Sequence, residues 1–302
     1  MRQEAYFCTV KELDELGKNN IPRQLISHTH LIYSSPATLA FNSPGAEGFG
    51  VKRAGLAVPD SVMLIVSPGC CGRNTSVLSS MRAYQDRFYY LLMDETDIVT
   101  GRHLKKIPKA VAEICEGLKK KPSVVMICIT CVDALLGTDM ERVCHKAEEY
   151  AGVPVRPCYM YALTREGRKP PMVHVRQSVY SLLEPKKKKG NVVNLLGYFS
   201  PLTDDCELYD LLHGAGVKTI HEISRCKDYA QYQTMSEANF NLVLHPEARF
   251  AAEDFHDRLK IPYIELRRLY EIDKIAVSIV LLPLHWVWNL RMKYRVRQQR
   301  RR

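Results

Sequence analysis

Residues 61–75 of this chain of 302 residues read SVMLIVSPGCCGRNT. The run from 61 to 66 is largely apolar, as expected of a buried strand, and a glycine-containing turn with two adjacent cysteines follows it. Further along the chain, a short apolar run, a turn and a segment of helical periodicity recur, which is typical of a parallel sheet with crossover helices. The sequence therefore predicts an α/β fold.

The recurring unit predicts two Rossmann-like domains, each with a doubly wound parallel sheet. In the first domain we expect strands at 61–66, 88–92, 123–130 and 153–158 and helices at 104–120, 138–150 and 173–183. A capping box at 138–141 is expected to begin the second of these helices. In the second domain we expect strands at 192–196, 217–221 and 239–244 and helices at 204–213, 227–235 and 246–259.

The clearest boundary is the Glu184-Pro185 pair, which a run of lysines follows. It predicts an N-terminal domain at 1–184, a basic linker at 185–190, a second domain at 191–275 and a tail at 276–302. Residues 276–290 of the tail contain no Asp, Glu, Lys or Arg, and an arginine-rich end follows them. Fifteen residues are short for a membrane span, which needs about twenty. The tail could be an anchor in the membrane interface or the product of a frameshifted or truncated reading frame. We favour the second explanation.

The net charge of +10 comes mostly from the tail, whose last twelve residues supply seven positive charges and no negative ones, so the rest carries +3. This distribution does not favour a nucleic-acid partner, which would need cations and aromatic side chains across a folded face. The ten cysteines follow a polar N-terminus without the pattern of a signal peptide. We therefore expect a cytoplasmic protein whose thiols are reduced, with no membrane partner.

Two groups of cysteines lie at predicted strand ends, where open α/β sheets bind ligands. Cys70 and Cys71 form the turn after the first strand, and Cys128 and Cys131 bracket the end of the strand at 123–130. The periodicity of that strand predicts that Cys128 packs in the core, whereas Cys131 emerges at the loop. A dithiol of Cys128 and Cys131, a zinc site and an iron–sulfur site all remain open at this point.

The order of the motifs resembles the nitrogenase component 1 superfamily over residues 60–275. It rests on the Pro-Gly-Cys turn, MDETDIVTG at 93–101, Thr130-Cys131 and LGTD at 136–139, and then on NLLG at 194–197, GAGV at 214–217, NLVL at 241–244 and IPY at 261–263. The resemblance implies an iron–sulfur cluster, of the 4Fe–4S type, at a subunit interface. Its ligands would be Cys131 and either Cys70 or Cys71.

The chain also departs from the family pattern. The earliest cysteine loop of the family should fall near 42–50, and that stretch has glycines but no cysteine. Where catalytic nitrogenase subunits hold their large cofactor through a cysteine, this chain has Leu244 and His245. His245 could ligate a metal or donate a proton, but a structural role at the strand-to-helix turn is favoured. The third domain of the family is missing from the sequence.

The leading functional hypothesis is an iron–sulfur oxidoreductase component that forms a homo- or heterodimer with a like subunit. The resemblance implies that an ATP-dependent iron protein similar to the nitrogenase reductase would supply its electrons. The chain itself has no phosphate-binding loop with the Gly-Lys-Ser/Thr signature. The alternatives are a metallocofactor-assembly scaffold without turnover and a thiol–disulfide oxidoreductase that uses Cys128 and Cys131.

Overall fold

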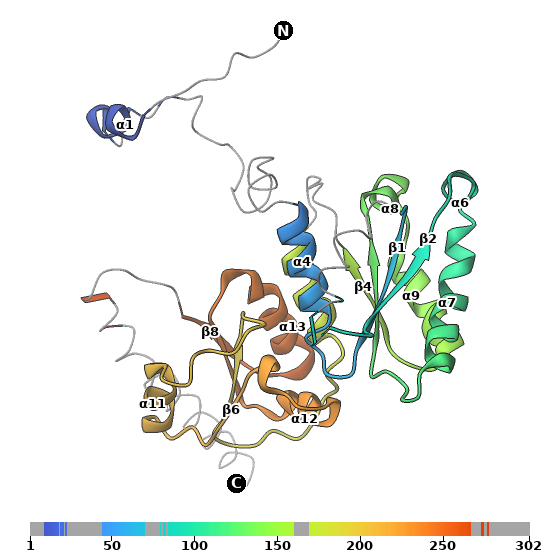
Figure 1. The fold of residues 1–302 in the computed structure, drawn as a ribbon. Coiled ribbons are helices and arrows are strands. Elements are labelled where there is room, and N and C mark those ends of the chain that lie inside the picture. The colour runs from blue at the N-terminus through green and yellow to red at the C-terminus, as the bar shows by residue number, and fades with distance from the viewer. Residues whose placement is uncertain are drawn as a thin grey trace.

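The computed structural model describes residues 9–17, 19–20, 22, 44–69, 79, 81–82, 84–159, 169–266, 273–274 and 277, with the backbone alone at 10, 44–49, 131, 134 and 135. Two parallel four-stranded sheets form its framework (Figure 1). Both are flanked by helices, so the predicted α/β class is confirmed. Most of the expected tail lies outside the described residues. No helix of the described part has the length and apolarity that a bilayer crossing requires.

Sheet A has the order β2-β1-β3-β4. Its strands are β1 (Val62–Ser67), β2 (Phe88–Leu92), β3 (Val125–Ile129) and β4 (Val155–Tyr159). Every residue of β1 and β3 is buried, as expected for inner strands covered on both faces. The four predicted strands are therefore confirmed.

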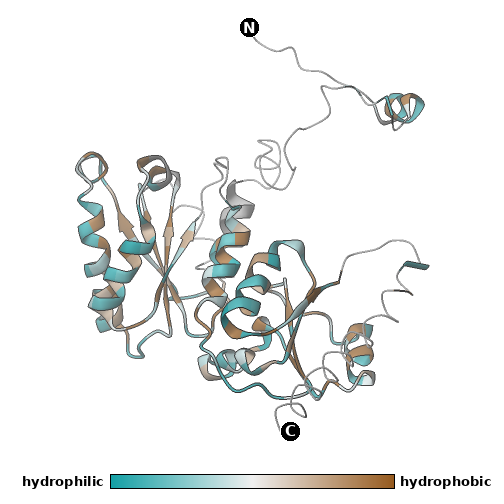
Figure 2. Ribbon diagram, turned by 180° about the vertical axis from the view of Figure 1, so that it is seen from behind, coloured by the Kyte–Doolittle hydropathy of each residue, from teal (hydrophilic) through white to brown (hydrophobic). Residues whose placement is uncertain are grey.

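Alternate residues of β1 and β3 face two different cores, because side chains point to opposite faces along a strand. Val62, Leu64 and Val66 pack with α7 (His103–Gly117) and α9 (Met140–Ala151). Met63 and Ile65 face α4 (Pro44–Gly55) and α10 (Pro171–Tyr180). Figure 2 shows hydrophilic colour on α7 and α9, which cover one face of sheet A, and hydrophobic colour on the strands beside them.

Sheet B repeats the same order as β6-β5-β7-β8. The strands are β5 (Val192–Leu196), β6 (Thr219–His221), β7 (Phe240–Val243) and β8 (Tyr263–Glu265). Helix α11 (Glu207–Gly214) packs on one face. The other face is covered by α12 (Tyr229–Gln233), the 3-10 turns η3 (Thr234–Glu237) and η4 (Pro246–Ala248), and α13 (Arg249–Leu259).

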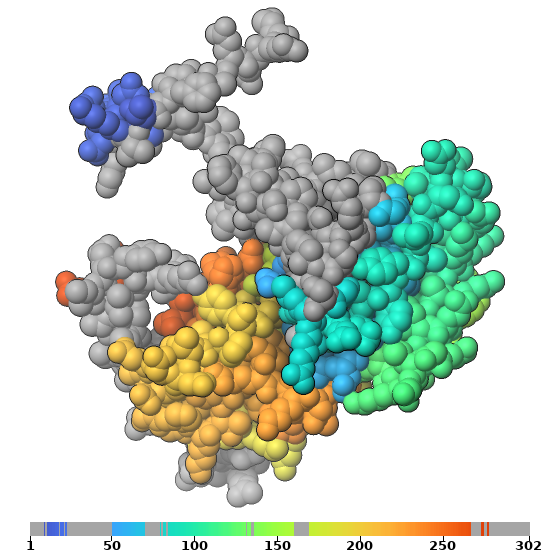
Figure 3. Space-filling view, in the orientation of Figure 1, coloured from blue at the N-terminus to red at the C-terminus, as the bar shows by residue number. Residues whose placement is uncertain are grey.

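One apolar core continues from sheet A into sheet B. It includes Met63 and Cys128 of the first sheet, Val179 of α10, Leu196 of the second sheet and Phe255 of α13. The rings of Tyr180 and Phe255 meet edge to face with their centroids 5.2 Å apart. Figure 3 shows the two lobes, coloured cyan to green and yellow to orange, in contact along one side. The proposed domain limits at 184 and 191 remain a prediction.

Several elements escaped the sequence prediction, among them α1 (Val10–Leu16), α4, α6 (Glu95–Thr100), α8 (Cys131–Leu136) and β8. The predicted capping box at 138–141 is wrong. Helix α9 begins one residue later, and the Asp139 carboxylate accepts the hydrogen bond from the Arg142 amide. The Thr138 hydroxyl donates instead to Asp133 Oδ1, 3.2 Å away, because the loop folds back on α8.

Candidate functional site

The strand order creates a crevice at the carboxyl end of sheet A. The chain passes from β1 to β2 on one side and later returns to β3 on the other, so the connections after β1 and β3 diverge. Val66 of β1 pairs with Ile129 of β3, which places the next residues, Ser67 and Thr130, at neighbouring strand ends. The two predicted cysteine loops begin at these two residues.

The structure positions the predicted ligands only in part. Cys131 is the first residue of α8, and Thr130 is its N-cap, so the prediction that Cys131 leaves the strand is confirmed for the backbone. Cys70 and Cys71 lie outside the described residues. The expected loop at 42–50 is wrong where the structure describes it, because residues 44–50 belong to helix α4. The use of Cys70, Cys71 and Cys131 as ligands remains a prediction.

Buried polar atoms without a hydrogen-bond partner gather at this end of sheet A. They are Ser67 Oγ, Thr130 Oγ1 and Asp133 Oδ2, from side chains that are at most 1% exposed. Burying such groups unpaired is costly, and native proteins rarely leave them so. The arrangement therefore indicates a partner that the described residues do not provide.

His103, which the sequence did not single out, links α6 and α8. Its Nδ1 lies 2.9 Å from the Asp97 carbonyl oxygen and its Nε2 lies 2.9 Å from Asp133 Oδ1, with both side chains buried. A carbonyl only accepts, so Nδ1 carries a proton. A second proton must lie between Nε2 and the Asp133 carboxyl for that contact to be a hydrogen bond. The pair thus holds a buried proton beside the Thr-Cys loop.

Asp97 joins the same edge to two cations. Its carboxylate accepts hydrogen bonds from Lys106 Nζ at 2.7 Å and from Arg102 Nε at 2.6 Å. These two cations hold the pKa of Asp97 well below its usual range. The Asp94 side chain caps α6 by accepting from the Asp97 amide. The turn between α6 and α7 is therefore fixed by charge as well as by the backbone.

Two exposed apolar side chains lie on the helices that His103 connects. Val99 of α6 is 85% exposed and Leu136 of α8 is 50% exposed. Both helices rise beyond the strand ends of sheet A (Figure 1). Apolar side chains at the rim of a site suit a protein partner better than solvent.

Cys128 lies in the core, as its place in the strand predicted. It is fully buried and in register with the equally buried Cys158 of β4. The Cys158 thiol donates to the Val51 carbonyl at 3.5 Å, and the hydrogen bond with Cys128, together with burial, raises the pKa of Cys158 well above its ordinary value. The same hydrogen bond lowers the pKa of Cys128, but full burial keeps both thiols away from a substrate.

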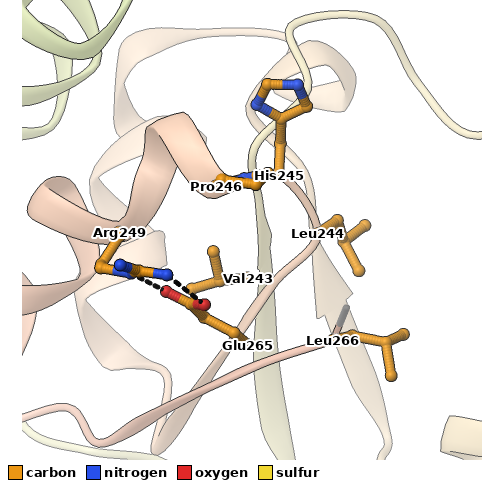
Figure 4. A pocket seen from close by; sticks show the side chains of 7 residues that line it. All are labelled: Val243, Leu244, His245, Pro246, Arg249, Glu265 and Leu266. Carbon is orange, nitrogen blue, oxygen red and sulfur yellow. Dashed lines mark hydrogen bonds and ion pairs between the residues drawn. The ribbon is translucent and has the colours of Figure 1, made fainter. Parts of the chain in front are cut away.

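The corresponding end of sheet B contains His245 after β7. Its Nδ1 accepts from the Glu247 amide at 3.3 Å and so caps η4, which supports the structural role favoured from the sequence. A pocket of about 290 Å³ lies beside it, with His245 directed away from the ion pair of Arg249 and Glu265 (Figure 4). Within the described residues, no group of three His, Cys, Asp or Glu side chains is placed to hold a metal.

Arg176 of α10 joins the two inner strand ends of sheet B to the first lobe. Its guanidinium donates to the Gly197 carbonyl at 2.7 Å and to Glu247 Oε2 at 2.8 Å, and it lies over the Phe199 ring. Gly197 has φ of +136°, and a Cβ there would lie 2.7 Å from the His245 amide nitrogen. The ends of β5 and β7 are therefore held together by contacts within the chain, and the pocket beside His245 extends toward the end of β8.

Similar proteins were found by sequence and by structure. "Nitrogenase iron-molybdenum cofactor biosynthesis protein NifE" of Nostoc sp. is 27% identical over 225 residues, which are 72% of this chain and 46% of that protein. NifE of Klebsiella pneumoniae is 26% identical over 244 residues, which are 74% of this chain and 53% of that protein. The chain thus spans about half the length of these relatives.

Solved structures of nitrogenase Cp1 share the fold. The structure at pH 6.5 superposes with a TM-score of 0.58 at 16% identity and covers 88% of this chain and 61% of the other. The structure at pH 5 gives a TM-score of 0.52 at 22% identity, with 71% and 46% covered. The family model for nitrogenase component 1 type oxidoreductases matches residues 47–282. This chain therefore belongs to the nitrogenase component 1 type oxidoreductase family.

Proposed function

We propose that this chain binds an iron–sulfur cluster at the end of sheet A and serves as a cytoplasmic scaffold in metallocofactor assembly. Cys131 and one of Cys70 and Cys71 would supply thiolates, the preferred ligands of such clusters. One observation carries the proposal: the two cysteine loops leave adjacent inner strands at the point where their connections diverge.

The buried groups around this crevice fit an iron–sulfur cluster. Among the described residues, the Ser67 and Thr130 hydroxyls are donors without an acceptor, and cluster sulfur atoms accept hydrogen bonds. His103 and Asp133 fix α8, whose first residue is Cys131, against α6 and α7. A bound cluster would supply one-electron transfer, while these side chains orient the thiolate loop and exclude water from it.

Two observations favour assembly over substrate reduction. The relatives from Nostoc and Klebsiella carry the name of cofactor biosynthesis proteins. In addition, the end of β7 presents Leu244 and the capping His245 rather than a thiol. An oxidoreductase component would use the same site, and it remains the second candidate because the whole match lies in an oxidoreductase family.

Either role requires protein partners. Two mapped loops provide fewer thiolates than the four that usually hold a 4Fe–4S cluster, so a like subunit would complete the set across a dimer interface. An ATP-dependent iron protein would deliver electrons. The exposed Val99 and Leu136 beside the site support a docked protein there.

The proposal is tested by anaerobic reconstitution of the full chain with iron and sulfide, followed by metal analysis and electron paramagnetic resonance. Wild type should take up a cluster, Cys131→Ala should lose it, and one of Cys70→Ala and Cys71→Ala should lose it. Cys226→Ala, a partly buried thiol of the second lobe, is the matched control and should load normally. A wild-type chain that stays colourless, or a Cys131→Ala variant that loads like wild type, refutes cluster binding at this site.

Scaffold and oxidoreductase differ in the fate of the metal. A scaffold should transfer its iron to a cofactor-free acceptor protein of the nitrogenase component 1 type when the two are mixed anaerobically. An oxidoreductase component should keep its iron through repeated reduction by an iron protein and ATP. Retention of iron together with steady electron consumption would overturn the scaffold role.

A further inference from the structure

Six buried side-chain atoms in the described part of the chain have no hydrogen-bond partner. Asn194 Oδ1 and Asn241 Nδ2 lie within strands, and these two amides already bond to each other through their remaining atoms at 2.7 Å. Ser224 Oγ lies apart in a 3-10 turn. The other three, from Ser67, Thr130 and Asp133, lie together where β1 and β3 end.

The backbone at Ser67 is fixed by hydrogen bonds, so it cannot shift to bring the hydroxyl to a hydrogen-bond acceptor. Its carbonyl oxygen accepts from the Met93 amide at 3.0 Å, and β1 is paired with strands on both sides. The side chain is 0% exposed, so water does not reach it either. An alanine would fit the same strand without the cost of an unpaired hydroxyl.

Thr130 has a local partner available and does not use it. A threonine at an N-cap normally accepts from an amide in the first turn, as Thr9 does from Glu12 at 3.2 Å in α1. Thr130 occupies the N-cap of α8 but makes no such bond, and it is 1% exposed. Its hydroxyl is therefore free to donate to a group outside the chain.

We propose that the Ser67 and Thr130 hydroxyls donate hydrogen bonds to sulfur atoms of the cluster and thereby raise its reduction potential. The inference rests on the proposed function, since it requires a cluster between the two loops. A hydrogen bond to sulfur stabilises the reduced cluster more than the oxidised one, because the reduced cluster carries the additional negative charge. Asp133 Oδ2 is not included, because the Asp133 carboxyl is already engaged through Oδ1 with His103 and Thr138.

The first test is a redox titration of the reconstituted full chain with dithionite as reductant, followed by electron paramagnetic resonance. Ser67→Ala and Thr130→Val should each shift the midpoint potential to lower values, and the double variant should shift it further. Thr130→Ser keeps the donor and should restore the wild-type potential. Ser236→Ala removes a buried hydroxyl that donates to the Gln233 carbonyl at 2.8 Å, far along the chain, and should leave the potential unchanged.

The second test needs no cluster. In the iron-free full chain, Ser67→Ala and Thr130→Val remove unpaired buried hydroxyls, so their thermal midpoints should equal or exceed that of wild type. Ser236→Ala removes a satisfied hydroxyl and should lower the midpoint. If the thermal midpoints of all three variants fall by the same amount, the Ser67 and Thr130 hydroxyls have partners within the chain and the inference is wrong.

The outcomes separate this inference from the proposed function. If wild type takes up no iron, the proposed function fails and the hydroxyls have no cluster to contact. If wild type loads a cluster and Ser67→Ala and Thr130→Val keep the wild-type potential, cluster binding stands and the hydroxyl inference is refuted.

Discussion

The carboxyl ends of the two sheets have the same topology and opposite chemistry. In both sheets the first strand lies inside, and the connections after it and after its inner neighbour diverge. At the end of sheet B, Arg176 and the close approach of Gly197 to His245 hold the inner strand ends together with contacts in the chain. At the end of sheet A, three buried oxygen atoms have no partner among the described residues. The two sheets thus share a topology, while the side chains at their inner strand ends differ in whether they satisfy one another.

The largest effect is expected for His103→Leu. The substitution leaves the Asp133 carboxyl buried without its partner at 2.9 Å, so the free energy of unfolding should fall by about 3 to 4 kcal/mol. Chemical denaturation measures the loss. The control is His245→Leu at the end of sheet B, which removes the cap of a 3-10 turn and an edge contact with the Tyr198 ring and should lower the free energy of unfolding by about 1 to 2 kcal/mol. Equal losses would remove the contrast between the two ends.

Arg176→Met should lower the free energy of unfolding by about 3 kcal/mol. This loss is slightly smaller than for His103→Leu, because Glu247 is 21% exposed and keeps part of its hydration. The Gly197 carbonyl also loses its donors. Arg102→Met, the matched change at the end of sheet A, removes a half-exposed guanidinium and should lower stability much less. Chemical denaturation measures both variants. If Arg176→Met and Arg102→Met lower the free energy of unfolding by similar amounts, sheet B does not depend on its buried arginine.

Gly197→Ala and Gly137→Ala compare two glycines with positive φ. At Gly197 a Cβ would meet backbone 2.7 Å away, and we expect a loss of about 2 to 3 kcal/mol. Gly137 ends α8 with φ of +70°, and a Cβ there would meet nothing within 4 Å. Only the left-handed backbone conformation then destabilises the alanine variant, by about 1 kcal/mol. Thermal unfolding ranks the two variants, and the reverse order would contradict the close packing after β5.

Acid should weaken the first lobe through His174, whose ring meets Tyr159 of β4 edge to face at 4.3 Å. Burial, with Lys169 nearby, lowers the pKa of His174 to about 4. The folded value lies below the unfolded value of about 6.5, so the unfolded chain binds the proton first. Stability is complete above pH 6.5 and should fall by about 2 kcal/mol by pH 5.

The variant His174→Phe should flatten this pH dependence in denaturation curves recorded between pH 7 and pH 5. The exposed His145→Gln provides the control and should keep the wild-type slope. If His174→Phe retains the wild-type slope, the loss of stability in acid arises elsewhere in the chain.

The sequence alone determined the parallel α/β class and the inner strands, because uninterrupted apolar runs between turns have few other folded solutions. It also placed Cys131 after β3 and Cys128 in the core, since a strand periodicity of two residues distinguishes them. The short α6 and α8 were missed, as six residues carry too little periodicity to be recognised.

Only the tertiary structure brought His103 to Asp133, across 30 positions of sequence, and placed the Ser67 and Thr130 hydroxyls without partners at neighbouring strand ends. Thr138 illustrates the reason: its local sequence predicted a helix cap, and a contact with Asp133 replaced it. Local patterns specify elements, whereas hydrogen-bond partners depend on which elements the fold brings together. The cysteines of the candidate site could therefore be predicted from the sequence. Which buried hydroxyls have no hydrogen-bond partner among the described residues depends on the pairing of β1 with β3.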